Sequence, residues 1–538
     1  KESYTRECLS ASITSNDILA LCNYSPAYDR LSIADAIHVR QICALYSKRA
    51  DLELGIDKRR AAVDSFIAAE VLCRQTNDIL QKKRRGEFSY SPRVESAFLH
   101  AQRKIASILG DVPNLSELKV SFGPGATTQV QKRMASAKRK LSQTFACSED
   151  LLPVVRQCIE ELEGWVFADE ADETTAKKVA VEIHTSRLSF VPKNYKTYRS
   201  VGVEPALNTM FQGGIGKYIS DRLRKFGVDI HDQSRNRELA REGSITGALA
   251  TLDLSSASDT IATELIYELL PVDWAIFLNM FRTRAITVEG YSFNQEKFCS
   301  MGNGFTFPLE TLIFYALAFG CCVDDELVQK VSAYGDDLIV PVTCVPLVRE
   351  VLTASGFILN MDKSFFSGKF RESCGADYLS GIDIRPSYVK DALCGFDIFR
   401  LHNQYVRRGD FEFASILLEY LDPSLIKWGP DGYGDGHLIG DRPLSPYKRE
   451  RGWSGYVFET YTFKPKRDFT VLPGDRVYPL YCAYVKEQDA VKHPNLREFA
   501  RNFEAGLPEH RYDSRERLGV SIPGRYGYSL IKIYVLSN

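Results

Sequence analysis

The chain has 538 residues, of which 44% are hydrophobic and 25% are charged, and its formal net charge is −1. These values are typical of a globular protein with more than one lobe, and they exclude low-complexity and collagen-like chains. The 13 cysteines are scattered without a Cys-x-x-Cys pair, which argues against structural zinc and a disulfide framework and fits a reducing cytosol.

Residues 1–245 are expected to be mainly helical. The segment from Ala61 to Leu80 carries apolar residues at helical spacing, which indicates a core-facing helix. Basic clusters follow at 82–85, 132–133, 138–140 and 222–225. Each cluster alone is typical of a solvated helix face, but together they suggest a channel with a basic lining, which a nucleic acid requires even when the whole chain is nearly neutral.

A basic segment runs from Val191 to Arg199. It contains Lys193, Lys196 and Arg199, three cations spaced three residues apart. Such cations can neutralise a triphosphate and a leaving pyrophosphate. Considered alone, the segment is also typical of an ordinary solvated basic face.

The next candidate is the stretch from Ala250 to Asp259. An apolar approach ends in Asp253, and small polar residues follow, which predicts a strand that delivers one carboxylate before a helix begins. Alone, Asp253 would be interpreted as a helix N-cap. A metal-binding role for Asp253 is favoured over the N-cap because a second acidic motif lies farther along the chain.

A glycine-containing loop precedes an apolar helix between residues 300 and 319. Gly302 and Gly304 let the backbone approach a ligand closely, and Ser300 and Asn303 can hydrogen-bond a ribose hydroxyl. Pro308 suits a first helical turn, and the apolar run after it is too short to span a bilayer. A plain turn before a core helix is the alternative.

The most informative motif runs from Tyr334 to Asp337. Apolar residues flank it on both sides, which predicts a β-hairpin whose tip presents Asp336 and Asp337 to hard cations. Gly-Asp-Asp is also ordinary turn composition. If Asp253 meets this tip in the folded chain, three carboxylates can hold two Mg²⁺ ions for phosphoryl transfer, with Mn²⁺ or Ca²⁺ able to substitute in binding.

Lys363 follows the hairpin and is a candidate general acid that protonates pyrophosphate, although an ordinary surface lysine is nearly as good an interpretation. Farther on, aromatic residues gather, including Tyr433, Trp453, Tyr456 and Phe458. They can stack on bases, but packing in the fold is the simpler expectation.

These motifs, in this order, resemble the palm motifs of RNA-directed RNA polymerases. More narrowly, the chain resembles the replicase beta subunits of positive-strand RNA bacteriophages, the Q-beta and MS2 (levivirus) group. The matching stretches are 190–194, 232–234, 242–244, 253–259, 300–307, 334–337, 370–375 and 431–436. The resemblance is dense from about 190 to 390, and Pro308 departs from the family pattern.

The resemblance implies an α+β, right-hand polymerase fold with an antiparallel palm sheet backed by helices. Residues 1–245 would form the fingers, with a loop near 190–200 that contacts nucleotide and template. Residues 246–385 would form the palm, and residues 386–538 the thumb and C-terminal region. Arg371 and Glu372 would lie next to the primer strand, unless they form a structural ion pair.

The resemblance also implies roles for individual residues. Asp253, Asp336 and Asp337 would hold the metals, and Lys363 would act as the acid. Ser300, Gly302 and Asn303 would line the ribose side of the nucleotide. The three cations Lys193, Lys196 and Arg199 would contact its phosphates.

The predicted function is template-directed RNA synthesis from ribonucleoside triphosphates on single-stranded RNA, with release of pyrophosphate. The resemblance adds host elongation factors Tu and Ts, a small-subunit ribosomal protein as a further partner, no membrane, and the bacterial host cytoplasm as the location. The alternatives are a reverse transcriptase-like polymerase and a non-catalytic RNA-binding scaffold on the same fold. A reverse transcriptase would carry a bulky side chain soon after Asp253 to block a 2′-hydroxyl. Here Leu254 is followed by Ser, Ser, Ala and Ser, and Asn303 can accept the hydroxyl, which disfavours the reverse transcriptase.

Overall fold

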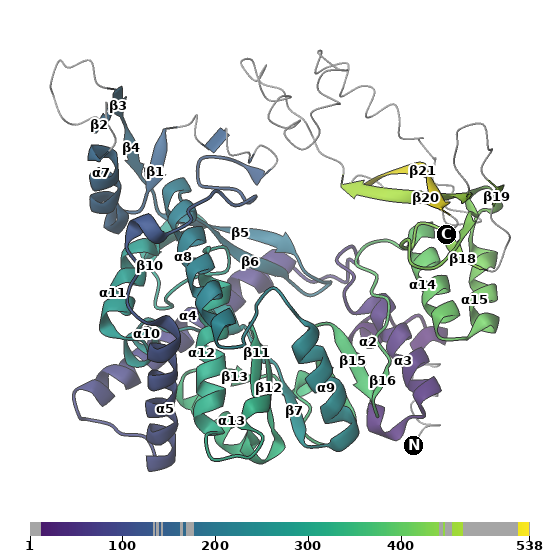
Figure 1. Ribbon diagram of the computed structural model, residues 1–538, viewed down its shortest axis with the longest axis horizontal. Coiled ribbons are helices and arrows are strands. Elements are labelled where there is room, and N and C mark those ends of the chain that lie inside the picture. Colours follow the sequence, from purple (N-terminus) through teal and green to yellow (C-terminus); the bar gives the residue numbers. More distant parts are fainter. Residues whose placement is uncertain are drawn as a thin grey trace. The chain divides into compact units, whose positions relative to one another are not determined.

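Figure 1 shows a computed structural model of the chain. The structure describes residues 12–132, 135, 139–140, 144–161, 165–167, 177–440, 445–446, 455–465 and 526–536. Helices and strands are mixed along the chain, so the predicted α+β class is confirmed. Of the C-terminal aromatic residues, Trp453 lies outside the described residues.

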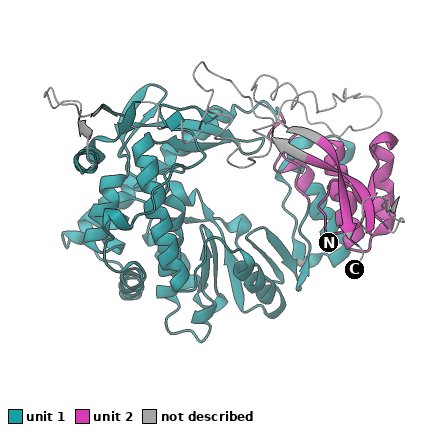
Figure 2. Ribbon diagram, turned by 45° about the horizontal axis from the view of Figure 1, so that its top comes forward, with its two compact units in different colours: residues 1–43, 53–386 teal, residues 44–52, 387–538 magenta. Residues whose placement is uncertain are grey.

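The described residues form two compact units, coloured separately in Figure 2. Unit 1 comprises residues 1–43 and 53–386, and unit 2 comprises residues 44–52 and 387–538. Unit 1 contains every residue predicted for the catalytic and nucleotide sites. It does not separate residues 1–245 from residues 246–385, so the fingers, palm and thumb boundaries stay a prediction.

The first part of unit 1 is helical and then turns to strands. Its helices are α2 (Ile18–Asn23), α3 (Ile33–Tyr46, which continues into unit 2), α4 (Lys58–Arg84), α5 (Pro92–Leu109), α7 (Leu152–Glu160), α8 (Ala206–Lys225) and α9 (Ser234–Thr246). Its strands are β1 (Phe145–Cys147), β2 (Trp165–Phe167), β3 (Lys177–Val179), β4 (Val181–Ile183), β5 (Ser186–Pro192) and β6 (Tyr198–Val203). Helices dominate residues 1–245, as expected, but short strands interrupt them between 145 and 203, where β-branched and aromatic residues favour strands.

The rest of unit 1 alternates short strands with helices. Its helices are α10 (Thr263–Leu269), α11 (Val272–Phe281), α12 (Thr306–Cys321) and α13 (Val345–Ala354). Its strands are β7 (Leu249–Leu252), β8 (Leu254–Ser255), β9 (Ala285–Val288), β10 (Tyr291–Asn294), β11 (Ser332–Tyr334), β12 (Asp337–Pro341), β13 (Ile358–Leu359), β14 (Phe370–Ser373), β15 (Ala376–Leu379) and β16 (Ile382–Asp383).

A three-stranded antiparallel sheet, in the order β11-β12-β7, forms the centre of unit 1. Helices α9 and α12 pack against its strands (Figure 1). All four residues of β7 are buried, because helices and neighbouring strands cover it. This is the antiparallel sheet backed by helices that the sequence predicts.

Helix α12 is the core helix of unit 1. Fourteen of its residues are buried, so it is covered around most of its circumference and packs against α5 and α8 as well as the sheet. Pro308 lies in its first turn, as predicted. In the part of the chain that the structure describes, no helix is both long enough and apolar enough to cross a membrane.

Unit 2 contains helices α14 (Gly395–Arg407) and α15 (Phe411–Leu417) and strands β17 (Trp428–Gly429), β18 (Leu438–Ile439), β19 (Ser445–Pro446), β20 (Gly455–Pro465) and β21 (Tyr526–Leu536). Strands β20 and β21 pair along their full lengths. The loop between β17 and β18 contains Gly434 and Asp435. Arg407 of α14 pairs with both Asp431 and Asp435, so these ion pairs hold the loop to the helix.

Candidate active site

The central sheet brings the two acidic motifs together. Strands β7 and β12 are antiparallel, and Leu252 lies opposite Leu338. Asp253 leaves the end of β7 and Asp337 begins β12, so the two residues lie side by side at the same end of the sheet. Segments that are far apart in the sequence thus deliver their carboxylates to one place.

The hairpin between β11 and β12 has a two-residue loop, because Tyr334 pairs directly with Asp337. Gly335 has a φ of +58°, and a positive φ at the first loop residue is the pattern of a type II′ turn. A Cβ atom added to Gly335 would lie 2.5 Å from Cε2 of Phe307. The Gly335 amide also donates to Thr311 Oγ1 at 2.9 Å, so helix α12 holds the tip that carries Asp336.

The three carboxylates share one weakly solvated environment. Desolvation and the charge of Asp336 raise the pKa of Asp253 to about 6, while Lys363 and Asn360 oppose the shift. Desolvation and the charges of Asp336 and Asp253 raise the pKa of Asp337 to about 7. Desolvation also raises the pKa of Asp336, although Lys363, Arg199 and Lys193 oppose that shift. The negative charges repel one another at short range, and nearby cations compensate them only in part.

Asp253 is held by the segment that follows β13. Asn360 Nδ2 donates to Asp253 Oδ2 at 2.8 Å, and the Asn360 amide donates to the Asp253 carbonyl at 2.9 Å. Ser364 Oγ accepts from the Asp253 amide at 3.1 Å. Lys363 Nζ lies 4.0 Å from Asp253 Oδ2. Lys363 therefore lies where the sequence predicts, whereas Asn360 was missed, since no local pattern marks an amide that acts across strands.

The basic segment is the hairpin loop between β5 and β6, where Pro192 pairs with Tyr198. Its anchor is Tyr195, which is 1% exposed and donates its hydroxyl to Asn23 Oδ1 at 2.6 Å. Desolvation and the charges of Arg199 and Lys363 lower the pKa of Lys193, while Asp259 and Asp253 oppose the shift. The positive charges of Lys193 and Arg199 therefore favour the ionised form of the Asp336 carboxyl group, whose pKa they lower.

Lys196, the third predicted cation, is exposed, and its ammonium lies 5.4 Å from the centre of the Tyr195 ring. Two of the three predicted cations, Lys193 and Arg199, thus act electrostatically on Asp336, whereas Lys196 lies over the ring of Tyr195.

The predicted nucleotide loop lies against β6. Ser300 and Asn303 are both buried. Gly302 has a φ of +110°, and a Cβ atom there would lie 2.3 Å from the Gly202 carbonyl oxygen, so only glycine fits. Asn303 Oδ1 accepts from the Phe305 amide at 2.9 Å, while Asn303 Nδ2 has no hydrogen-bond partner among the described residues. One amide donor of this loop is thus left unused.

Two further carboxylates border the site. Burial, together with the charges of Asp336 and Asp259, raises the pKa of Glu310 well above its usual value. Asp259 accepts from the fully buried Lys297 Nζ at 2.9 Å, and Lys297 also lies 3.6 Å from Glu70. Asp259 is the last residue of a 3-10 turn (Ala257–Asp259), and the helix that follows, α10, has Ala262 at its N-cap.

Arg371 and Glu372 were expected near a primer strand or in a structural ion pair. Arg371 is fully buried and donates to the carbonyls of Leu249, Ser367, Gly368 and Phe370. Glu372 pairs with Arg40 of α3 at 3.0 Å. Both side chains therefore hold strands and helices together, which favours the structural interpretation.

A divalent ion fits the chemistry of Asp253, Asp336 and Asp337, because carboxylate oxygens are hard ligands and the mutual repulsion of these groups is relieved by a cation. Within the described ranges, however, no three His, Cys, Asp or Glu side chains are arranged to hold a metal ion. Asp253 Oδ2 is instead engaged by Asn360 and lies near Lys363.

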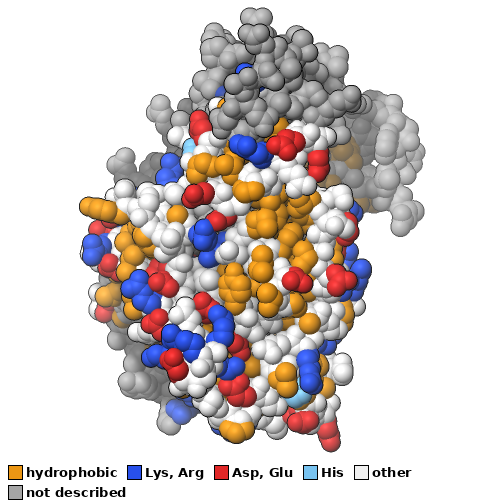
Figure 3. Space-filling view, turned by 90° about the vertical axis from the view of Figure 1, so that its left-hand side faces the viewer, with side chains coloured by type: hydrophobic (Ala, Val, Ile, Leu, Met, Phe, Trp, Pro, Cys, Tyr) orange, Lys and Arg blue, Asp and Glu red, His pale blue; other side chains and the backbone are white. Residues whose placement is uncertain are grey.

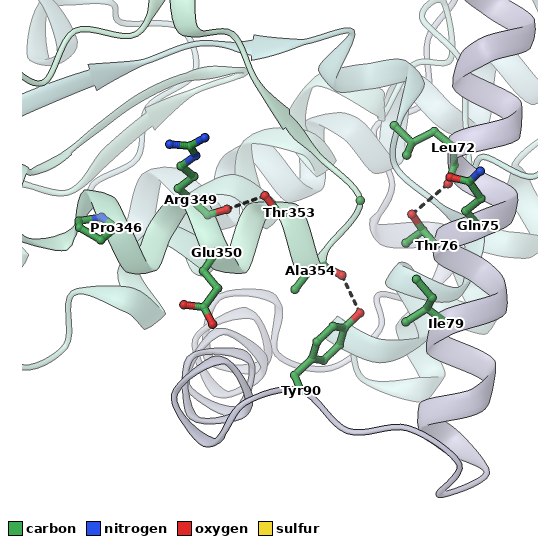
Figure 4. Close-up of a pocket in the computed structure, with 11 residues that line it drawn as sticks. Leu72, Gln75, Thr76, Ile79, Tyr90, Pro346, Arg349, Glu350, Thr353 and Ala354 are labelled. Carbon is green, nitrogen blue, oxygen red and sulfur yellow. Dashed lines mark hydrogen bonds between the residues drawn. The ribbon is translucent and has the colours of Figure 1, made fainter.

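The best-defined pocket of unit 1 lies elsewhere. It has a volume of about 570 Å³ and is lined by residues of α4, α13 and the loops beside them, including Leu72, Ile79, Tyr90 and Arg349 (Figure 4). None of the predicted site residues lines it. Figure 3 shows another view of the surface, where hydrophobic side chains gather and charges of both signs surround them.

The chain is similar to known proteins along most of its length. Residues 36–521 match the family model described as RNA replicase, beta-chain. The RNA-directed RNA polymerase subunit beta of Escherichia virus Qbeta is 36% identical over 484 residues, which is 87% of this chain and 80% of that protein. The beta chain of Escherichia phage MS2 is 44% identical over 200 residues, 37% of each chain.

Among solved structures, the RNA-dependent RNA polymerase of a human picorbirnavirus is 14% identical, with a TM-score of 0.31 over 43% of this chain and 56% of that one. That likeness is too low to support an assignment. The named phage relatives favour the RNA polymerase prediction over the reverse transcriptase and scaffold alternatives.

Proposed function

Because the chain belongs to the RNA replicase beta-chain family and is an RNA-directed RNA polymerase, we propose that Asp253, Asp336 and Asp337 hold the divalent ions that its nucleotidyl transfer requires. The observation that carries this proposal is the register of β7 and β12, which sets Asp253 beside the hairpin tip. Two Mg²⁺ ions are the proposed occupants, and when bound they supply positive charge to the attacking and leaving oxygens.

The basic loop binds the triphosphate in this proposal. Lys193 and Arg199 supply charge to its phosphates, and their influence on Asp336 supports this role. Lys196 takes a peripheral part, since it lies on the Tyr195 ring. Lys363, which is 61% exposed and near Asp253, donates the proton that the leaving pyrophosphate takes up.

The loop from Ser300 to Gly304 receives the sugar. Gly302 lets the backbone approach closely, and Asn303 Nδ2 is the donor left over for a ribose hydroxyl. Base pairing with the template supplies sequence information, so the protein reads shape and the 2′-hydroxyl. RNA template and ribonucleoside triphosphates are the substrates expected of this family.

The decisive experiment is Asp336→Asn. We expect RNA synthesis to fall at least about a thousandfold, because several kcal/mol of charge stabilisation are lost with the ion, while binding of RNA is retained. Asp324→Asn, an exposed aspartate in a turn, is the matched control and should behave as wild type. Wild-type synthesis by Asp336→Asn would remove Asp336 from the metal site.

The resemblance to the phage replicases also suggests partners. We propose that the host elongation factors Tu and Ts, and a ribosomal protein of the small subunit, join the chain in the bacterial cytoplasm. Capture of the tagged chain from a bacterial lysate, followed by mass spectrometry, tests this. Absence of both factors from a preparation that is active in RNA synthesis would contradict it.

A further inference from the structure

Glu204 is a buried carboxylate that the proposed mechanism does not use. It directly follows β6 and is only 4% exposed. Its Oε2 atom accepts hydrogen bonds from Thr283 Oγ1 and from Gln212 Nε2, the latter at 3.2 Å. Both donors are neutral, so no charged side chain is hydrogen-bonded to this carboxylate among the described contacts.

Gln212, one of the two donors to Glu204, also holds the Gly304 end of the loop from Ser300 to Gly304. Gln212 Oε1 accepts from the amide of Gly304 at 3.3 Å. Gln212 Nε2 donates to the Phe281 carbonyl at 3.0 Å, as well as to Glu204. One glutamine side chain therefore connects Glu204 directly to the backbone of the loop.

The Ser300 end of the loop is connected to Glu204 through Gln295 and Thr283. Ser300 Oγ donates to Gln295 Oε1 at 2.7 Å, and Gln295 Nε2 donates to the Thr283 carbonyl at 3.2 Å. Thr283 in turn donates its hydroxyl to Glu204. Both ends of the loop from Ser300 to Gly304 are thus joined to one carboxylate.

The middle of the loop is fixed by β6, the strand that leads into Glu204. The Gly202 amide donates to the Met301 carbonyl at 2.7 Å. The same strand carries Arg199, which acts on Asp336. Strand β6 therefore links the phosphate side of the proposed nucleotide site to its sugar side.

Burying an ionised carboxylate among neutral donors costs desolvation free energy. Desolvation raises the pKa of Glu204 to about 7, against the opposing effects of Thr283, Gln212 and Arg282. A leucine would fill much of the same space without that cost, but it would offer no acceptor to Thr283 and Gln212. A buried acceptor at this position is therefore best explained by the geometry that it imposes on its neighbours.

We propose that Glu204 is a positioning residue that fixes the loop from Ser300 to Gly304 and thereby sets the preference of the enzyme for ribose over deoxyribose. The inference rests on the proposed function, in which Ser300 and Asn303 face the sugar. Selection of a single hydroxyl depends on sub-ångström placement of its hydrogen-bond partners, which a fully connected network supplies.

The test is Glu204→Leu in the replicase preparation that supports RNA synthesis. Leucine offers no acceptor to Thr283 or to Gln212, which both donate to Glu204 Oε2, so the loop should shift. We expect KM for ribonucleotides to rise roughly tenfold and the ratio of ribonucleotide to deoxyribonucleotide kcat/KM to fall roughly tenfold. The maximal rate and the binding of Mn²⁺, measured by electron paramagnetic resonance, should change much less.

A second pair of variants keeps the test available if Glu204→Leu folds poorly. Thr283→Val removes one donor to the same carboxylate at equal size, whereas Thr283→Ser keeps the hydroxyl. We expect the former to lower sugar discrimination and the latter to preserve it. Asp397→Leu is the matched control for replacing a buried acid by leucine, because Asp397 is 5% exposed and lies in unit 2.

Wild-type discrimination by folded Glu204→Leu and Thr283→Val would overturn the inference, as would an equal loss in Asp397→Leu. Asn303→Ala separates this failure from failure of the proposed function. If Asn303→Ala lowers discrimination and Glu204→Leu does not, only the positioning role of Glu204 is wrong. If Asn303→Ala also leaves discrimination unchanged, the sugar site itself lies elsewhere.

Discussion

Asp253, Asp336 and Asp337 are placed for metal binding at a cost to the stability of the fold. Burial raises the pKa of each of these carboxyl groups, and repulsion adds to the shifts of Asp253, to about 6, and of Asp337, to about 7. Their pKa values in the unfolded chain are close to 3.9. The folded state therefore binds more protons than the unfolded state between about pH 4 and pH 7, so these groups destabilise the metal-free protein progressively as the pH rises through that range.

This balance predicts that Asp337→Asn raises the Tm of the metal-free protein. The variant removes one repelled charge, and the gain should amount to a few degrees at pH 8. Below about pH 4 the wild-type carboxyl group is protonated as well, so the difference in Tm should shrink toward zero. Thermal melts of both proteins across this pH range, with a chelator present, measure it.

The same variant should lose most of the rise in Tm that Mg²⁺ gives the wild type, because ligands stabilise only the state that binds them. A metal-free Tm that is lower than that of the wild type at pH 8 would show that Asp337 is held by favourable contacts. In that case the account of the site as a cluster of repelling charges would be wrong.

Asn360 is the residue that orients Asp253. Its side-chain amide occupies Oδ2 at 2.8 Å, which leaves Oδ1 for a metal ion. We predict that Asn360→Ala weakens Mn²⁺ binding about 10–100-fold, the usual effect of removing a partner of a metal ligand. Titration calorimetry measures this independently of activity, and Asp362→Asn, an exposed neighbour, is the control. Unchanged Mn²⁺ affinity in Asn360→Ala would show that Asp253 needs no such support.

At the scale of elements, the hairpin between β11 and β12 works because its tip has no side chain at Gly335. Tip and helix α12 are in contact there, and the position of Asp336 depends on that contact. We predict that Gly335→Ala lowers RNA synthesis by about a hundredfold or more, since the new methyl group would displace the tip from Phe307.

The hairpin between β9 and β10 supplies the control. Gly290 also has a positive φ, of +91°, but a Cβ atom there would meet nothing within 4 Å. Gly290→Ala should therefore cost a similar backbone strain and similar stability while leaving synthesis nearly unchanged. Equal activity losses in the two variants would mean that strain, and not displacement of Asp336, explains the effect at Gly335.

Considered over the whole molecule, sequence reasoning succeeds where a residue's role is local. The hairpin at Tyr334–Asp337, the core helix around Pro308 and the strand that ends just before Asp253 all follow from patterns within about ten residues. It fails for Asn360 and Lys297, whose partners lie far along the chain, and for Glu204, which joins Gln212 to the distant Thr283. Their roles come from tertiary packing, and no spacing of residue types marks a side chain that acts across strands.

The basic clusters illustrate the same limit. The sequence suggests that residues 82–85 line an RNA channel. In the structure Lys83 pairs with Glu268 at 2.6 Å, and Arg84 pairs with Glu264 at 2.6 Å. Arg85 pairs with Glu87 at 3.3 Å. These cations are neutralised by neighbouring acids, in agreement with the net charge of −1 and with the mixed charges on the face in Figure 3.

The last prediction follows from this neutralisation. Each phosphate contact on single-stranded RNA contributes roughly 0.7 to the slope of log Kobs against log salt concentration. Because the acids already occupy these side chains, the double variant Arg84→Gln, Arg85→Gln should keep the wild-type slope and lose only the small stability of exposed ion pairs. Filter binding of single-stranded RNA between about 50 and 200 mM salt measures the slope. A decrease of about 1.4 in the magnitude of the slope, which corresponds to the loss of two phosphate contacts, would show that this cluster binds RNA.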